Sequence, residues 1–346
     1  MLCGARRALT VGETFLVKEA QMKRSWYLTM IVPVVLVLAA CSVSTSPGGA
    51  TNTSGAKSGS ITIGFSNATQ QSPFYVSLGE AVKKEAESEG ATVNYVDANG
   101  DITKQNNDIQ DLITKNVSVL VINPVDPKGI APSLAAAKAA NIPVITVDRP
   151  ANGVLAFVGR DNVAMGKLVG DAVKAKLGSA GGKIIEIQGD AGGAVAADRK
   201  QGFHDAFKGD SNVTFVEGPY ANYIRSQAVT AMQDLLQANP DVKVVYAHND
   251  DMALGALQVL KENGRADVLV AGVDGLMEAV KAIAKGDQYV ATAVNDPSAE
   301  GALAAKTAIQ IAKGTKVKSS IDAGTALISK DNASSYSGST LFAVAK

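Results

Sequence analysis

From residue 61 onward, short apolar segments alternate with segments in which apolar residues recur every three or four positions. The first pattern is typical of buried strands and the second of amphipathic helices. Strands are predicted over residues 61–65, 92–96, 117–122, 144–147, 183–187, 213–216, 242–247, 268–273 and 290–294. Helices are predicted over residues 132–140, 162–177, 198–208, 225–238, 250–263 and 275–285, along a face with Phe74, Leu78, Ala81 and Val82, and along another with Ile109, Leu112 and Ile113.

This alternation predicts an α/β fold. Apolar strands interleaved with helices favour parallel sheets that are covered on both faces. Ten or so strands in about 285 residues fit two doubly wound lobes better than one sheet. We therefore expect two Rossmann-like lobes with parallel sheets.

An internal repetition points to the edge where a ligand would bind. Asn123 and Asp148 follow two successive apolar strands, and Asn249 and Asp274 do the same further along the chain. Each Asn precedes its Asp by 25 positions. Because open α/β sheets bind ligands at the carboxyl ends of their strands, the two pairs are predicted to face a ligand cleft.

The side chains at these positions suit a ligand covered in hydroxyl groups. Asn both donates and accepts hydrogen bonds, and an ionised Asp accepts only. Arg149 and Arg199, the latter at the start of a predicted helix, would add fixed forks of donors. The alternative is that Asp148 and Asp274 cap the helices that follow and that Arg149 pairs at the surface.

Two aromatic residues follow Ser72 in the loop before the first predicted helix. An aromatic side chain there can stack on the apolar C–H face of a sugar ring. By its position on the helix, Phe74 fits the core equally well, whereas Tyr75 lies off the apolar face and next to the loop. Tyr75 is therefore the better candidate on the pattern alone.

Composition excludes several classes of protein. Lys plus Arg and Asp plus Glu number 33 each, so no nucleic-acid partner is indicated. Two cysteines, Cys3 and Cys41, and two histidines allow neither a disulfide framework in the folded part nor a Cys/His metal site. We expect no cofactor.

Catalytic motifs are also missing from the sequence. It contains no GxSxG or HExxH motif, and the glycine-rich segment 189–193 has the wrong spacing for a phosphate-binding loop. His248 fits a loop residue better than a general base. The chain is not expected to be an enzyme.

The first residues are typical of a targeting segment. Residues 1–40 are predicted to be a leader whose signal peptide begins at Met22, with basic residues before the apolar run 26–40. A transmembrane anchor is the alternative, but the run is shorter than the ~20 residues that span a bilayer. The Leu-Ala-Ala-Cys segment ending at Cys41 resembles a bacterial lipobox, which implies lipidation of that cysteine. Residues 41–59 are predicted to be a flexible tether, so the protein would be exported and anchored by lipid to the cell membrane, facing the periplasm or exterior.

Several stretches together resemble one family. The chain is similar to the ribose-binding branch of the periplasmic sugar-binding proteins of ABC transporters at residues 72–78, 122–124, 142–149, 249–256 and 273–275. The resemblance implies a type I periplasmic binding protein, in which a hinge of three chain crossings near residues 160, 295 and 322 joins the lobes. It divides the folded part into an N-terminal lobe, 60–160 plus 296–322, and a C-terminal lobe, 161–295 plus 323–346.

The same resemblance implies which side chains hold the ligand. Phe74 and Tyr75 from one lobe and Tyr223 from the other would sandwich a sugar. Its hydroxyls and ring oxygen would be held by Asp148, Arg149, Arg199, Asn249 and Asp274, with Asn123 lining the cleft.

The chain departs from the family's ribose binders at four of the ligand positions. Ser72 stands where they carry Asn, Tyr75 and Tyr223 where they carry Phe, and Asn295 where they carry Gln. These changes leave ribose, another pentose, a hexose, a furanose sugar or a polyol open.

The function implied is capture of a monosaccharide or polyol by a monomer and its delivery to an ABC transporter permease. A sensor for chemotaxis or signalling is a compatible alternative, and an exported sugar-processing enzyme is a third. A repressor of the lactose-repressor type would share the two-lobed core. It would need a DNA-reading helix-turn-helix where this chain has its leader and tether.

Overall fold

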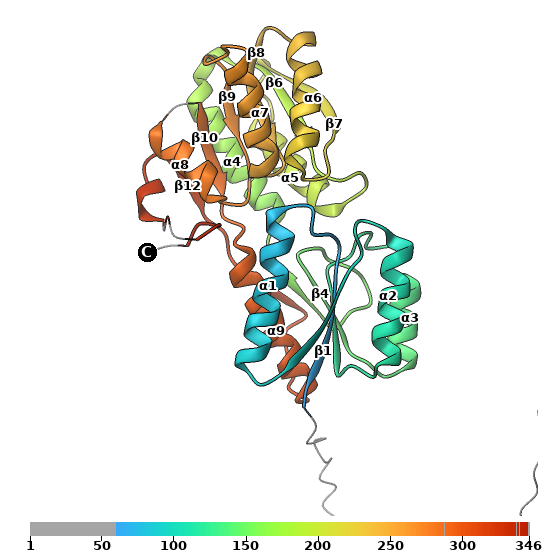
Figure 1. Ribbon diagram of the computed structural model, residues 1–346. Coiled ribbons are helices and arrows are strands. Elements are labelled where there is room, and N and C mark those ends of the chain that lie inside the picture. The colour runs from blue at the N-terminus through green and yellow to red at the C-terminus, as the bar shows by residue number, and fades with distance from the viewer. Residues whose placement is uncertain (1–59, 287, 337, 339, 345–346) are drawn as a thin grey trace, which may run out of the picture. The chain divides into compact units, whose positions relative to one another are not determined.

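The fold contains two six-stranded sheets. The computed structural model describes residues 60–344, apart from 287, 337 and 339 (Figure 1). The first sheet has the spatial order β2 (Thr92–Asp97), β1 (Thr62–Asn67), β3 (Val119–Ile122), β4 (Val144–Val147), β5 (Ala156–Gly159) and β11 (Ser320–Asp322). The second has the order β7 (Val213–Tyr220), β6 (Gly182–Gln188), β8 (Val242–Ala247), β9 (Leu269–Ala271), β10 (Tyr289–Ala293) and β12 (Leu327–Ser329). Neighbouring strands run parallel, except that β12 is antiparallel to β10.

Helices cover both faces of each sheet (Figure 1). Those on the first sheet are α1 (Pro73–Ser88), α2 (Ile102–Thr114), α3 (Ala131–Ala139) and α9 (Pro297–Ala312). Those on the second are α4 (Asn162–Leu177), α5 (Ala194–Ala206), α6 (Arg225–Ala238), α7 (Asp250–Glu262) and α8 (Met277–Lys285). Two short 3₁₀ turns complete the described elements, at Gly178–Ala180 and Ala333–Ser335. The helices pack in pairs, α1 with α9, α2 with α3, α4 with α5, and α6 with α7.

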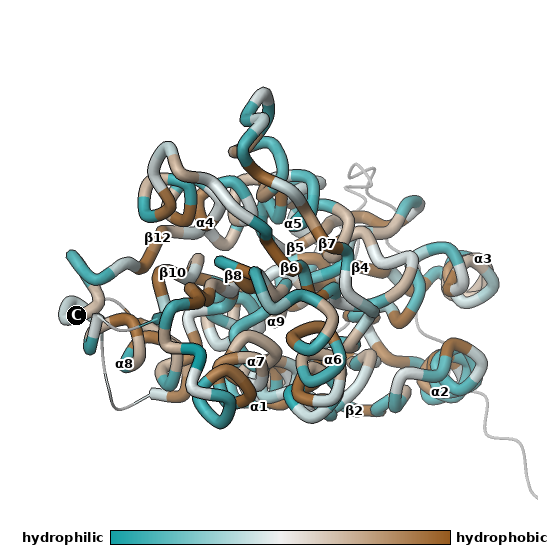
Figure 2. The backbone as a smooth tube through the Cα atoms, turned by 90° about the horizontal axis from the view of Figure 1, so that it is seen from above, coloured by the Kyte–Doolittle hydropathy of each residue, from teal (hydrophilic) through white to brown (hydrophobic). Residues whose placement is uncertain are grey.

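Alternating side chains of the central strands build separate apolar layers. In β6, Ile184 packs into the cluster of α4 and α5, whereas the next residue, Ile185, packs into the cluster of α6 and α7. In β3, Leu120 packs into the cluster of α2 and α3, whereas the next residue, Val121, packs into the cluster that includes α1. Successive side chains of a strand point to opposite faces of the sheet, and helices cover both faces. Buried strands are therefore apolar at every position in the sequence. Along the helices, hydrophobic and hydrophilic positions alternate, as α2 and α6 show in Figure 2.

The chain passes between the two sheets three times. It leaves the first sheet after β5 and enters the second through α4. It returns after β10 through α9, adds β11 to the first sheet, and then crosses again to β12. The last described segment lies against the loop before α8, where the amide of Ala343 donates to the carbonyl of Gly275. The three crossings lie near residues 160, 295 and 322–326.

The predicted fold class is confirmed, and each of the nine predicted strands is present. The sequence pattern did not indicate β5, β11, β12 or α9. The predicted start of one helix was wrong, because α5 begins at Ala194 rather than at residue 198. Its first turn, Ala-Val-Ala-Ala, forms a helix directly after the glycines at 192 and 193. The predicted leader, tether and Cys41 lie outside the described residues.

None of the helices in the described part of the chain is long and apolar enough to cross a membrane.

Candidate functional site

The two predicted Asn–Asp pairs lie at the carboxyl ends of adjacent strands. Asn123 and Asp148 follow β3 and β4, and Asn249 and Asp274 lie just beyond β8 and β9. The backbone is unusual at both aspartates, with φ of 65° at Asp148 and 126° at Asp274, and also at Tyr223, with φ of 61°. Non-glycine residues rarely adopt such angles, and those that do concentrate at functional sites.

A small cavity lies between Asp148, Tyr223, Asn249 and Asp274. Its empty volume is about 240 Å³, and its lining consists of Ser72, Phe74, Tyr75, Asp148, Val195, Arg199, Tyr223, Asn249, Asp274 and Asn295. Nine of these ten residues were predicted from the sequence as ligand contacts. The structure therefore brings together side chains that lie more than 200 positions apart in the chain.

Phe74 serves the core and the cavity at once. Its ring packs edge-on against Tyr75 and against Phe342 from the last described segment, with centroid distances of 5.5 and 6.2 Å. Phe74 therefore belongs to the core and also lines the cavity, and its contact with a ligand stays a prediction. Tyr75 is equally buried, and its hydroxyl accepts a 2.5 Å hydrogen bond from Arg149.

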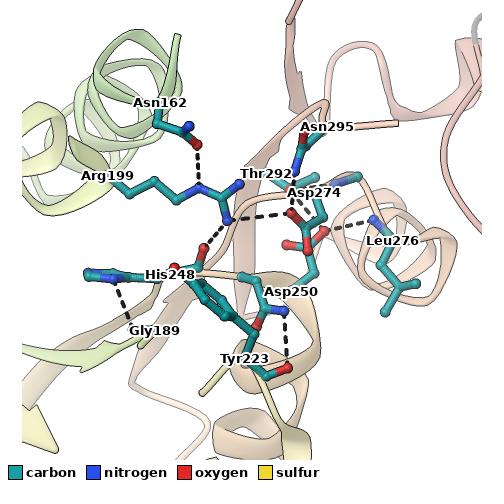
Figure 3. Close-up of polar contacts among 12 residues, drawn as sticks. Asn162, Gly189, Arg199, Tyr223, His248, Asp250, Asp274, Leu276, Thr292 and Asn295 are labelled. Atoms are coloured by element: carbon teal, nitrogen blue, oxygen red, sulfur yellow. Dashed lines mark hydrogen bonds and ion pairs between the residues drawn. The ribbon is translucent and has the colours of Figure 1, made fainter. Parts of the chain in front are cut away.

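Arg199 organises the side of the cavity that belongs to the second sheet (Figure 3). Its Nε donates to Oδ1 of Asn162 at 2.9 Å, and Nη1 donates to the carbonyl oxygen of His248 at 2.6 Å. The same nitrogen lies 3.5 Å from Oδ1 of Asp274. With Nε and Nη1 anchored, the fork is fixed toward the cavity.

Burial controls the ionisation of the two aspartates. It raises the pKa of Asp274 to about 7, although the nearby Arg199 acts in the opposite direction. Burial also raises the pKa of Asp148, against the opposing effect of Arg149 and Arg199. Above these raised pKa values the carboxylates are ionised and can accept hydrogen bonds from hydroxyls, which are worth about 1.5–3 kcal/mol when one partner is charged.

Two predicted residues lie beside the cavity rather than in its lining. Asn123 is fully buried behind Asp148, and its Nδ2 donates to Asp148 Oδ2 at 3.5 Å. Arg149 lines a larger groove, with an empty volume of about 1420 Å³, on the outer side of Tyr75 and Tyr223. There its Nη1 lies 3.2 Å from Oδ2 of Asp190.

The capping interpretation of the aspartates is wrong. The residue that caps α8 is Leu276 rather than Asp274, and the chain after Asp148 leads into β5. Arg149 is buried and not a surface residue. Asn249 does cap α7, because its Oδ1 accepts from the amide of Met252 at 3.0 Å.

Three predicted residues carry buried polar atoms that lack a hydrogen-bond partner. Among the described residues these include Ser72 Oγ, Asn123 Oδ1 and Arg149 Nε. Buried polar groups in proteins are almost always paired, so unpaired ones require an explanation. Of the three residues, only Ser72 lines the cavity, so its hydroxyl is the one that faces the space for a ligand.

His248 has a structural role. Its Nδ1 accepts from the amide of Gly189 at 3.1 Å, so Nε2 carries the proton and donates to Glu186 at 2.8 Å. Burial opposes ionisation of Glu186, but the hydrogen bonds from His204 and His248 outweigh it and lower its pKa to about 2. Within the described part of the chain, no group of three or more His, Cys, Asp or Glu residues is placed to hold a metal ion.

A sequence profile described as "Periplasmic binding protein domain" matches residues 63–316. The chain belongs to the periplasmic binding protein family. It is 38% identical over 291 residues to the ribose import binding protein of Bacillus subtilis, covering 84% of this chain and 93% of the relative. It is 32% identical over 238 residues to the galactofuranose-binding protein of Escherichia coli, covering 66% of this chain and 75% of that protein.

One solved structure is considerably more similar. An ABC transporter solute binding protein from Mycobacterium smegmatis, with bound glycerol, is 67% identical, with a TM-score of 0.81. The match covers 83% of this chain and all of the other. The proteins named in these comparisons are transport binding proteins rather than enzymes.

Sequence reasoning missed several residues of this binding protein's site. Val195 lines the cavity, Asn162 and Arg160 hold other site residues, and Asp190 pairs with Arg149. Only Asp190 had a readable signal, because it follows β6 at the same edge as the two Asn–Asp pairs. The glycines on both sides of Asp190 suggest a phosphate-binding loop, and the wrong spacing for such a loop hides the aspartate as a site residue.

Proposed function

We propose that this protein captures a monosaccharide or a related polyol outside the cytoplasm and delivers it to an ABC importer. The observation that carries the proposal is the cavity, in which three aromatic rings lie beside two buried carboxylates and a buried guanidinium. A sugar has apolar C–H faces and a rim of hydroxyls, so it matches both kinds of side chain.

In the proposed complex, Phe74, Tyr75 and Tyr223 contact the faces of the ring. Asp148 and Asp274 accept hydrogen bonds from its hydroxyls, and the remaining polar residues complete the rim: Ser72, Asn123, Arg149, Arg199, Asn249 and Asn295. Oxygen acceptors and nitrogen donors on both sides suit hydroxyls, which donate and accept at once.

Closure of two lobes around the ligand completes the proposal. We place the boundaries at 60–160 plus 296–322 for one lobe and 161–295 plus 323–346 for the other. The crossings near residues 160, 295 and 322 would act as the hinge. A ligand that contacts both lobes favours the arrangement in which both sets of contacts form.

The proposed cellular setting follows from the first residues of the sequence. Cleavage before Cys41 and lipidation of its sulfur would anchor a monomer to the membrane, with residues 41–59 as the tether. The bound form would then dock on a permease. Relatives named for ribose and galactofuranose, and one with bound glycerol, support a sugar or polyol cargo, and the four departures from the ribose binders leave its identity open.

Isothermal titration calorimetry of the full chain, freed of ligand by unfolding and refolding, tests the proposal. D-ribose, other pentoses, hexoses, furanose-forming sugars and polyols are titrated in turn. We expect saturable one-to-one binding of at least one of them, reduced at least 100-fold in Asp274→Ala. Absence of binding across the panel by a folded chain would overturn the proposal. Unchanged composition of the bound sugar after prolonged incubation separates binding from turnover.

A further inference from the structure

Arg160 lies at the first of the three crossings, between β5 and α4, and its side chain reaches both of the others. It is only 7% exposed. Its Nε donates to the carbonyl oxygen of Gly324 at 2.6 Å, and Nη2 donates to the carbonyl oxygen of Asp296 at 2.9 Å. One guanidinium therefore connects the three segments of chain that run between the sheets.

The remaining nitrogen, Nη1, makes two contacts. It donates to Oδ1 of Asn295 at 2.9 Å and pairs with the buried carboxylate of Glu300 in α9. Asn295 in turn donates from Nδ2 to Oδ1 of Asp274 at 3.0 Å, which Figure 3 shows beside the contact from Arg199. A chain of hydrogen bonds thus runs from the crossings to the cavity.

This chain has a fixed direction. A guanidinium only donates and an ionised carboxylate only accepts, whereas an amide can do either depending on which end it presents. Contact with Arg160 forces Asn295 to present its oxygen there and its NH₂ group to Asp274. If the amide turned over, both contacts would become unfavourable.

We propose that Arg160 is a positioning residue, which ties the three crossings together and fixes the Asn295 amide so that it donates to Asp274. Because Asn295 and Arg199 both contact Oδ1, Oδ2 of Asp274 is left to accept from a ligand hydroxyl. The inference rests on the proposed function. It predicts that the ligand hydroxyl at Asp274 acts as a hydrogen-bond donor.

The central test is a double-mutant cycle on sugar affinity, measured by calorimetry on the full chain. Arg160→Met alone would strand the Glu300 carboxylate, so Arg160→Met is combined with Glu300→Met, which replaces a buried pair by apolar side chains. This double substitution is compared in the wild-type and Asn295→Ala backgrounds. Arg265→Met, which removes an ion pair with Asp267 away from the cavity, is the control.

We expect the double substitution to weaken sugar binding about tenfold or more in the wild-type background and to have little further effect once Asn295 is alanine. It should also reduce the discrimination against deoxy analogues of the bound sugar, which a general loss of stability would not do. An equal loss in both backgrounds, or unchanged affinity in a folded variant, would overturn the inference.

A fallback variant covers the case in which the double substitution does not fold, and the wild-type titration separates failure of the proposed function from failure of the role of Arg160. If the double substitution fails to fold, Arg160→Lys retains the charge beside Glu300 but cannot reach all the acceptors, and the same cycle is measured with it. If the wild-type chain binds no member of the panel, the proposed function fails. If the wild-type chain binds but the cycle shows no coupling, only the role of Arg160 fails.

Discussion

Arg149 and Asp190 form an ion pair in which Nη1 and Oδ2 lie 3.2 Å apart, although Arg149 follows β4 of the first sheet and Asp190 follows β6 of the second. The pair lies on the outer side of the two tyrosines that line the cavity. Each tyrosine hydroxyl bonds to one member: Tyr75 accepts from Arg149, and Tyr223 donates to Asp190 at 2.9 Å. Four side chains thus form a continuous polar link across the mouth of the cavity.

Removal of the charge on Asp190 should accelerate ligand release. Asp190→Asn keeps the size of the side chain but loses the ion pair with Arg149, whose Asp190 end is partly exposed. We expect this loss to cost about 1 kcal/mol. We expect the dissociation rate to rise roughly 3- to 10-fold with little change in the association rate. Stopped-flow fluorescence or surface plasmon resonance would measure both.

A matched control for this effect is Asp267→Asn, which breaks the Arg265–Asp267 pair just before β9, at the other end of that strand from Asp274. It should leave both rates unchanged. A dissociation rate in Asp190→Asn equal to that of the wild type would show that the link across the mouth does not retain the ligand.

Affinity is predicted to depend on pH through Asp274. Burial raises its pKa to about 7, so the carboxylate that a hydroxyl would bind is fully formed only above neutrality. Affinity should therefore rise by up to tenfold per pH unit between pH 5 and about 7 and then level off. Titrations at half-unit intervals would establish the profile.

Stability of the ligand-free chain should follow the opposite trend at this residue. Since the folded-state pKa of Asp274 exceeds its usual value, the protonated form is favoured by folding. Its contribution is complete below pH 4 and is lost as the pH rises through 7. Asp274→Asn should flatten the affinity profile and remove this part of the stability profile. A profile unaltered by the substitution would assign the titration to another group, such as Asp250, whose pKa burial raises to about 6, or Glu300, whose pKa burial also raises against the opposing effect of Arg160.

The part of the site that the sequence predicted is the part that depends on local pattern. Asp148 and Asp274 each follow an apolar strand, and the rule that ligands bind at the carboxyl ends of strands places them together. The alternation of successive side chains of β3 and β6 between two apolar clusters also depends only on neighbouring residues in the sequence. The two-lobed fold follows from the same strand and helix periods.

What the sequence could not predict depends on contacts between distant segments. Arg160 and Glu300 are 140 positions apart, and nothing in the local pattern of either marks a buried pair. The short strands β11 and β12 have only three residues each, too few to show a period. The start of α5 was missed because its helical first turn adjoins two glycines, which are usually read as a loop.

The position of Arg199 depends on a close approach of two helices. A Cβ atom at Gly166 in α4 would collide with the carbonyl oxygen of Arg199 in α5. Gly166→Ala should therefore push α5 away, lowering stability by about 1–3 kcal/mol and weakening sugar binding through displacement of the guanidinium. Thermal unfolding and calorimetry would measure the two effects.

Gly170→Ala is the matched variant, because its Cβ would meet α5 at Phe203 and Ala206, one turn further from Arg199. Gly170→Ala should lower the free energy of unfolding about as much as Gly166→Ala does, but it should weaken sugar binding less. Equal losses of affinity in the two variants would indicate a general effect of α4–α5 packing.

Ser72 provides the sharpest separation of binding from folding. Its Oγ is buried and has no hydrogen-bond partner within the described chain, so Ser72→Ala removes no internal bond. Stability should stay the same or increase slightly, because an unpaired buried hydroxyl is itself unfavourable. If a ligand hydroxyl completes this bond, affinity should fall about 3- to 10-fold, corresponding to the usual 0.5–1.5 kcal/mol of one neutral hydrogen bond.

Thr146→Val tests the same chemistry away from the ligand. Thr146 Oγ1 is also buried and unpaired, but it belongs to the interior of β4 and does not line the cavity. This substitution should raise stability in the same way while leaving affinity unchanged. Loss of affinity in Ser72→Ala alone would identify Ser72 as a ligand contact, whereas parallel behaviour of the two variants would show that its hydroxyl is merely an unsatisfied group in the core.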